Sequence, residues 1–204
     1  MEQIYKESLW GNNNTVFYSG EGSHNPIIVD PYVTSVSSFL KSFKNPITIC
    51  DLGCGDFNVG KQLVRDTKKY IAIDIVQALI THNKQKFKVK NLEFQCLDIA
   101  KDKIPEADCA ILRQVLQHLS NTEVQEVVSK LSAFTYIILT EHLPERDFIP
   151  NKDIISGQGI RFKKQSGINL LAPPFNFKIK EKKLLSSITL DGGKGVIETI
   201  LYKV

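Results

Sequence analysis

Two acidic residues and two glycines stand where neighbouring apolar runs end. The first run ends in Asp51, and Gly53 and Gly55 follow it; a second run ends in Asp74, 23 positions after Asp51. Glycine has no Cβ, so a ligand can approach its backbone closely. A carboxylate at the tip of a second strand can accept hydrogen bonds from both hydroxyls of a ribose. The pattern predicts a cofactor that contains a nucleoside.

The turn after the first run excludes two common nucleotide cofactor sites. The dinucleotide pattern G-x-G-x-x-G fails because Asn58 stands at its third glycine. A pyrophosphate would be repelled by Asp51 and Asp56, and no G-K-S/T sequence follows. Acids instead suit a ligand with a positive centre and an ammonium group. S-adenosylmethionine has both.

The residues 51–56, Asp-Leu-Gly-Cys-Gly-Asp, resemble the first motif of the class I S-adenosylmethionine-dependent methyltransferases. Asp74 stands where that family places its ribose-binding acid. Segments resembling the family's third, fourth and fifth strands follow in order, at 92–99, 108–119 and 136–142. The resemblance runs from Pro46 to the C-terminus. One departure is Phe57, which stands where many members carry a third glycine, and we expect it to reshape the pocket near the methionine moiety.

The resemblance implies S-adenosylmethionine as the cofactor and S-adenosylhomocysteine as its product; no metal is expected. It also implies which residues contact the cofactor. These are Asp51, Gly53, Cys54, Gly55, Asp74, Ile75, Asp98, Ile99, Arg113 and Gln114.

Methyl transfer requires a nucleophile held close to the methyl carbon. A hydroxyl or ammonium acceptor also needs a base that takes its proton. His118 and His142 are the predicted catalytic residues, because each follows the expected end of a strand, and Glu141 is a further candidate. A packing role is the alternative for both histidines.

Two irregular segments are predicted to contact the substrate. The glycine-serine loop near the N-terminus contributes Tyr18, Ser19 and Ser23, which are expected to lie over the cofactor or to face an anionic substrate. The segment 143–176 is rich in proline and glycine and leaves the carboxyl end of a strand, where ligands of open α/β sheets bind. Its predicted substrate residues are Arg161, Phe175 and Asn176. Simple packing against the sheet is the alternative.

The elements that position these residues alternate between strand and helix patterns. We expect strands at 47–51, 70–74, 92–97, 109–113 and 135–141, and helices at 58–67, 75–86 and 121–132. A further helix is predicted to begin at Pro31 with Asp30 as its cap, and a terminal hairpin to pair 178–189 with 196–203. The prediction is an α/β fold, a three-layer αβα sandwich whose Rossmann-like, mostly parallel seven-stranded sheet has an antiparallel last strand.

The whole chain, 1–204, is expected to form a single methyltransferase domain. An N-terminal cap loop and helix at 1–44 precede a cofactor-binding core at 45–204, which contains the substrate loop 143–176. The composition is ordinary for a globular protein, with 42% hydrophobic and 24% charged residues. No apolar run is long enough to span a membrane, and no signal-peptide pattern opens the chain, so a cytoplasmic location is expected.

The four cysteines are interpreted as reduced thiols and not as a zinc site, because no second close pair accompanies Cys50 and Cys54. The net charge of +4 is weak evidence for an anionic partner.

Three functions remain open from the sequence. The first is methyl transfer to oxygen or nitrogen of a small polar metabolite, with a sugar or a cell-envelope precursor as one option. The second is an RNA methyltransferase, which the late lysines favour, although Arg113-Gln-Val-Leu stands where many base methylators carry N-P-P-Y/F. The third is a non-catalytic cofactor-binding module. The sequence leaves the acceptor and the oligomeric state open.

Overall fold

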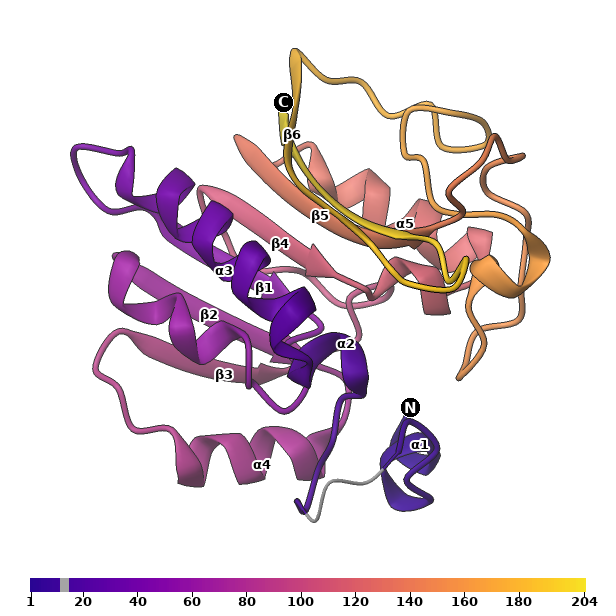
Figure 1. Cartoon of the computed structure of the whole chain (residues 1–204). Helices are drawn as coiled ribbons and strands as arrows, with labels where there is room; N and C mark the ends of the chain where they lie inside the picture. The colour runs from indigo at the N-terminus through magenta and orange to yellow at the C-terminus, as the bar shows by residue number, and fades with distance from the viewer. Residues whose placement is uncertain (12–14) are drawn as a thin grey trace.

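The computed structural model describes residues 1–11 and 15–204. Seven strands form one sheet in the order β3-β2-β1-β4-β5-β7-β6 (Figure 1). Strands β1 to β5 are parallel, whereas β7 runs antiparallel to both β5 and β6. This arrangement confirms the predicted fold class. The strands are β1 Thr48–Leu52, β2 Lys69–Asp74, β3 Leu92–Cys96, β4 Cys109–Arg113, β5 Tyr136–Leu143, β6 Glu181–Thr189 and β7 Val196–Lys203.

Helices cover both faces of the sheet because its inner strands alternate apolar side chains between the two faces. The α-helices are α1 Glu2–Lys6, α2 Glu21–His24, α3 Pro26–Lys41, α4 Gln77–Lys86 and α5 Asn121–Leu131. Short 3₁₀ turns are η1 Gly60–Gln62, η2 Val64–Asp66, η3 Leu116–His118 and η4 Arg161–Lys164. One core cluster joins α5 and residues 168–175 to the sheet, and the other joins α3, α4 and the 3₁₀ turn η2 to the opposite face.

Two helices differ from the sequence prediction. The predicted helix 58–67 is replaced by the short turns η1 and η2. Phe57 has a left-handed φ of 62° and is fully buried against the rings of Tyr70, Phe87 and Phe94. Its ring also lies where a side chain at Gly60 would be. Because of this packing, a regular helix does not form here. Phe57 lies in the core and not on the cavity wall, so the expectation that Phe57 reshapes the pocket near the methionine moiety is wrong.

The helix predicted to begin at Pro31 begins five residues earlier. Asn25 caps it by accepting a hydrogen bond from the backbone N–H of Ile27 at 3.0 Å, and Pro26 occupies the first turn. Asp30 is therefore inside the helix and not its cap. The helix continues through Pro31 because its buried face packs along the sheet.

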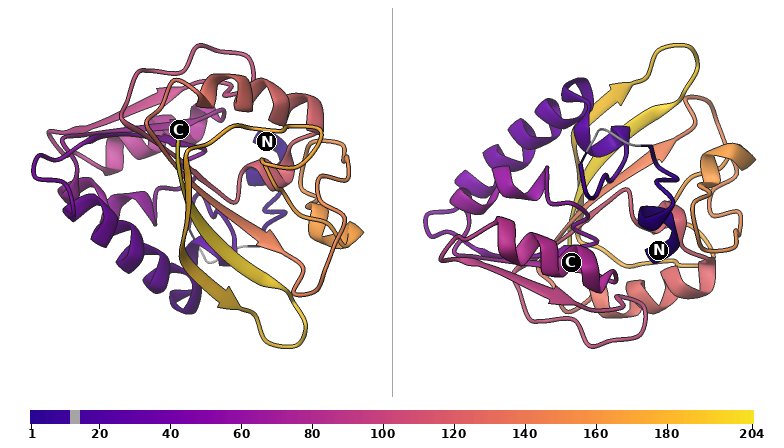
Figure 2. Two further views of the ribbon diagram at one scale, coloured as in Figure 1. Left: turned by 90° about the horizontal axis from the view of Figure 1, so that it is seen from above. Right: turned by 90° about the horizontal axis from the view of Figure 1, so that it is seen from below.

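The segment 143–176 is irregular, as predicted, except for η4. It is nevertheless tied together by Asn151, whose side chain bonds to both backbone groups of Asn169 and to the carbonyl of Pro173 at 2.8–2.9 Å. Figures 1 and 2 show the N-terminal segment with α1 beside this loop, beyond the carboxyl ends of the parallel strands. Among the described residues, no helix has the length and apolar character needed to cross a membrane.

Candidate active site

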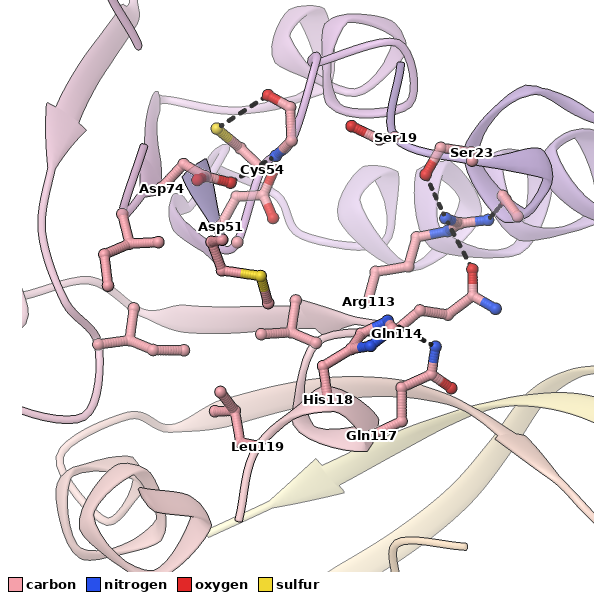
Figure 3. Close-up of a pocket in the computed structure, with 18 of the residues that line it drawn as sticks. Ser19, Ser23, Asp51, Cys54, Asp74, Arg113, Gln114, Gln117, His118 and Leu119 are labelled. Carbon is pink, nitrogen blue, oxygen red and sulfur yellow. Dashed lines mark hydrogen bonds between the residues drawn. The ribbon is translucent and has the colours of Figure 1, made fainter. Parts of the chain in front are cut away.

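A cavity of about 600 Å³ opens at the carboxyl edge of the sheet, beside the point where the strand order reverses between β1 and β4. Ligands of open α/β sheets bind at such a point. Its wall combines the ends of β1, β2 and β4, the turn η3, the N-terminal segment and part of the loop 143–176. Figure 3 shows side chains from the ends of β1, β2 and β4, from η3 and from the N-terminal segment around this space.

Asp51 is buried at the end of β1. Its carboxylate accepts a hydrogen bond from the Tyr70 hydroxyl at 2.9 Å. Burial, together with the nearby charge of Asp74, raises the pKa of Asp51 to about 7, although the Tyr70 hydrogen bond and the nearby Arg113 oppose the shift. A cationic ligand beside Asp51 would therefore favour its ionised form.

Asp74 ends β2 and is held by backbone N–H groups. One carboxylate oxygen accepts from Gly55 at 3.1 Å, and the other accepts from Val76 at 3.0 Å. Burial raises the pKa of Asp74, while these backbone bonds oppose the rise. The two bonds orient the carboxylate on the cavity wall.

The glycine turn is shaped by Gly53, whose φ of +94° is the left-handed region. A Cβ on Gly53 would lie 2.4 Å from a methyl carbon of Val115. The N–H groups of Gly53 and Cys54 both donate to the carbonyl of Ile73, at 2.9 and 2.8 Å. The turn is therefore fixed to β2, and glycine is required at its first position.

Arg113 ends β4, and its guanidinium faces the N-terminal segment. It donates to the carbonyl of Gly22 and, at 3.3 Å, to the hydroxyl of Ser23, and it lies 4.9 Å from the centre of the Tyr32 ring. Its buried Nε has no hydrogen-bond partner among the described residues. The next residue, Gln114, has a left-handed φ of 55°, which directs the chain into η3.

His118 ends η3 and lines the cavity. Its Nδ1 lies 3.1 Å from the carbonyl oxygen of Gly157, and the N–H of Gly157 donates to the carbonyl of His118 at 3.0 Å. A carbonyl only accepts, so the geometry assigns the proton of the neutral ring to Nδ1 and the lone pair to Nε2. Burial lowers the pKa of His118 below 6.5. The ring of Trp10 lies 5.2 Å away.

The structure brings together most of the residues predicted to form the site. All ten residues predicted to contact the cofactor line this cavity. His118, Ser19 and Ser23 line it as well.

The other predicted catalytic residues lie elsewhere. His142 stacks on Phe162 with ring centres 4.4 Å apart, and its Nε2 faces the carbonyl of Lys194. Glu141 is buried inside the sheet, and burial raises its pKa to about 8. Both residues belong to β5, which extends to Leu143 because β7 pairs with it throughout. Neither lines the cavity.

The remaining predicted substrate residues also lie outside the cavity wall. Tyr18 packs on the ring of His24, with ring centres 4.5 Å apart. Phe175 belongs to the core, and Asn176 is an exposed residue of a turn. Arg161 is fully buried behind η3.

The N-terminal segment supplies wall residues that the sequence did not indicate. Tyr5 bonds to the hydroxyl of Ser19 at 3.0 Å, and Trp10 lies against His118. The carbonyl of Leu9 accepts from the side chain of Gln158 at 2.7 Å. These residues lie in a polar stretch without periodicity or motif, so only the tertiary structure reveals them.

The described residues hold no group of three His, Cys, Asp or Glu side chains that would suit a metal ion. All four cysteines are free thiols.

Residues 49–135 match the sequence model of a family described as a methyltransferase domain. No curated protein sequence matches the chain. Solved structures share its fold. The N-methyltransferase NodS from Bradyrhizobium japonicum WM9, in complex with S-adenosyl-l-homocysteine, is 12% identical with a TM-score of 0.69, over 99% of this chain and 97% of that chain.

Two further structures cover almost the whole chain. Magnesium protoporphyrin IX methyltransferase (ChlM) from Synechocystis PCC 6803, with bound S-adenosylmethionine, is 18% identical with a TM-score of 0.59, over 99% of this chain and 91% of that chain. The N-terminal domain of EvdMO1, in the presence of S-adenosylhomocysteine and D-fucose, is 13% identical with a TM-score of 0.62, over 99% and 96%. The family match over residues 49–135 indicates a methyltransferase domain, and the whole chain shares its fold with S-adenosylmethionine-dependent methyltransferases.

Proposed function

We propose that this enzyme methylates an oxygen or nitrogen of a small polar metabolite, with His118 as the general base. The observation that supports this proposal is a cavity whose wall includes both the acid-bearing strand ends and His118. When bound, the cofactor supplies an electrophilic methyl group on a sulfonium.

The residues of the cofactor half fit S-adenosylmethionine in chemistry and size. Asp74 would accept the ribose hydroxyls, and Asp98 the adenine amino group between Ile75 and Ile99. At the methionine end, Asp51 would hold the ammonium group, while the unpartnered Nε of Arg113 would bond to the carboxylate. The cavity volume of about 600 Å³ leaves room for an acceptor beside the cofactor.

His118 has the form that a general base requires. Its lowered pKa keeps the imidazole neutral at pH 7, so Nε2 can accept a proton from a hydroxyl or ammonium group. The carbonyl of Gly157 accepts the Nδ1–H bond, so its dipole stabilises the imidazolium that forms.

The acceptor half favours a small, hydroxyl-rich compound. The N-terminal segment covers the cavity, so a large acceptor would have to displace it. Trp10 offers an aromatic face, and Gln117 and Gln158 offer amides that can bond to hydroxyls. Lys163 at the wall would suit an anionic substituent. A sugar or a charged sugar derivative, such as a cell-envelope precursor, fits these groups.

The test begins with calorimetric titration of S-adenosylhomocysteine. Methyl transfer from S-adenosylmethionine is then measured across a panel of sugars, amino sugars and nucleotide sugars, for the wild type and for His118→Gln. Transfer that His118→Gln abolishes while it retains cofactor binding supports the proposal. Cofactor binding without transfer to any compound of the panel would instead indicate the non-catalytic module.

Methylation of RNA is the second candidate function, because a basic surface lies on the edge of the sheet. Lys84, Lys86, Lys88 and Lys90 are exposed around the end of α4, and three of them line a shallow hollow against β3. Binding of RNA that weakens steeply with salt, together with methyl transfer to that RNA, would favour this function.

A further inference from the structure

Arg161 is a charged side chain that the proposed mechanism leaves without a role. It opens η4 in the loop 143–176, it has no exposed surface, and it does not line the cavity. Burying a guanidinium is costly unless its donors are all satisfied. Such a residue therefore indicates a specific structural requirement.

The guanidinium bonds to three separate segments. Nη1 donates to the carbonyl of Leu116 at 2.9 Å, Nη2 to the side-chain oxygen of Asn121 at 2.7 Å, and Nε to the carbonyl of Lys152 at 3.1 Å. Leu116 belongs to η3, Asn121 begins α5, and Lys152 lies in the loop. One side chain thus joins the turn that carries His118 to the loop that faces it.

The His118 imidazole depends on both of the parts that Arg161 joins. Its backbone belongs to η3, two residues after Leu116, while its Nδ1–H donates to the carbonyl of Gly157 in the loop. The N–H of Gly157 in turn donates to the carbonyl of His118. A displacement of the loop from η3 would separate Nδ1 from its acceptor, and the ring would lose both its orientation and its tautomer.

Arginine suits this position because its planar fork carries five donors in fixed directions. Glutamine in its place would offer two donors from one nitrogen and could not reach all three acceptors. Lysine would keep the charge but would present its donors from a single point. The only acidic side chain buried close to Arg161 among the described residues is Glu141, whose oxygens form no hydrogen bond there. The three oxygen acceptors therefore hold the guanidinium directly.

We infer that Arg161 is a positioning residue for His118, which it holds through η3 and Gly157 in the Nδ1–H tautomer, so that the lone pair stands on Nε2, which the side-chain amide of Gln117 approaches at 3.4 Å. The catalytic importance of this arrangement rests on the proposed function, whereas the arrangement itself can be measured without any acceptor.

The experiment is a long-range ¹H–¹⁵N correlation spectrum of the imidazoles at pH 7.5, which reports which ring nitrogen is protonated. The chain has four histidines, so His118→Gln assigns the signal directly. In the wild type, we expect Nδ1 of His118 to be protonated. In Arg161→Gln, the Nδ1–H population should fall, because Nδ1 loses its acceptor and only the 3.4 Å contact from the Gln117 amide to Nε2 still favours that tautomer. Lys164→Gln, an exposed cation of the same turn, should leave the wild-type pattern.

The fold of each variant is verified by S-adenosylhomocysteine titration and by thermal unfolding. A folded Arg161→Gln protein with the wild-type His118 tautomer would overturn the inference. If Arg161→Gln does not fold, Arg161→Lys decides: a reduced Nδ1–H population supports the inference, and an unchanged spectrum overturns it. A tautomer change in Arg161→Gln, combined with normal methyl transfer by His118→Gln, would support the positioning role and reject the proposed base.

Discussion

The two halves of the cavity are built in different ways. The cofactor half comes from consecutive elements, β1, the glycine turn and β2, whose parallel pairing brings Leu52 opposite Ile73 and so aligns both acid-bearing ends. The acceptor half is assembled from segments far apart in the chain: His118 bonds to Gly157, and Gln158 bonds to Leu9. The cofactor half therefore depends on local geometry, and the acceptor half on tertiary contacts.

This difference separates what each half can tolerate. A change in the glycine turn should act on cofactor binding, because the turn is fixed to β2 by its own backbone bonds. A change in the acceptor half should act on methyl transfer, because its elements hold His118 but do not form the strand ends. The following predictions test this separation.

The largest expected effect is on turnover by His118→Gln. Loss of a general base lowers the rate by about 10²–10⁴-fold, while the affinity for S-adenosylhomocysteine should stay within about twofold of the wild type, a difference of less than 1 kcal/mol. His142→Gln is the matched control, because His142 lies outside the cavity wall and should retain turnover. Steady-state methyl transfer to the acceptor found in the panel measures both. Equal loss in both variants would contradict the assignment.

The next effect concerns how the buried carboxyl group of Glu141 in β5 changes the stability of the folded protein with pH. Glu141 has a pKa of about 8 in the folded protein, above its ordinary value of 4.5. The folded state therefore retains a proton that the unfolded state loses, so this contribution to stability is present below pH 4.5 and declines as the pH rises to 8. The side chain of Glu141→Gln does not ionise, so the variant does not lose this stability as the pH rises. Its free energy of unfolding relative to the wild type should therefore increase between pH 5 and 8, by up to about 4 kcal/mol.

Urea unfolding of both proteins at several pH values measures this difference. Parallel stability curves would show that Glu141 is ionised in the folded protein, contrary to its burial within β5.

Gly53→Ala tests the cofactor half. The substitution forces a Cβ into the left-handed region and against Val115, so we expect the turn to shift and cofactor affinity to fall by about 10–100-fold, or about 1.4–2.7 kcal/mol. Gly193→Ala is the control, because Gly193 has a similar φ of +70° in the β6–β7 hairpin, with open space around it. Calorimetric titration should show wild-type affinity for this control. Similar losses in both variants would mean that backbone strain alone, and not the shape of the turn, governs binding.

The smallest expected effect is a change in pH dependence. Because burial lowers the pKa of His118, the neutral base persists below pH 6.5, and kcat/KM should decline only as the pH falls through that lowered pKa. The decline should approach tenfold per pH unit. A pH–rate profile whose acid limb lies above 6.5 would show that another group controls activity.

The same difference explains how much the sequence could predict. The strand ends were predictable because apolar runs, glycines and acids are local signals, and the residues chosen from them all line the cavity. Glu141 and His142 were predicted at the strand end that faces the cavity, but they lie within β5. Pairing with β7 extends β5 to Leu143, and a local sequence pattern does not encode that pairing. Tyr5 and Trp10 reach the cavity only through packing of the N-terminal segment. In the same way, burial of Phe57 overrode the helix expected after the glycine turn.

The central claim is that the cavity at the ends of β1 and β2 binds the cofactor through Asp74. Calorimetric titration of S-adenosylhomocysteine into the wild type and into Asp74→Ala tests it most directly. We expect saturable binding to the wild type, and a loss of about 1–3 kcal/mol in the variant, or about 5–150-fold in Kd. Both proteins should unfold cooperatively. No binding to the wild type, or equal affinity in the two folded proteins, would contradict the account.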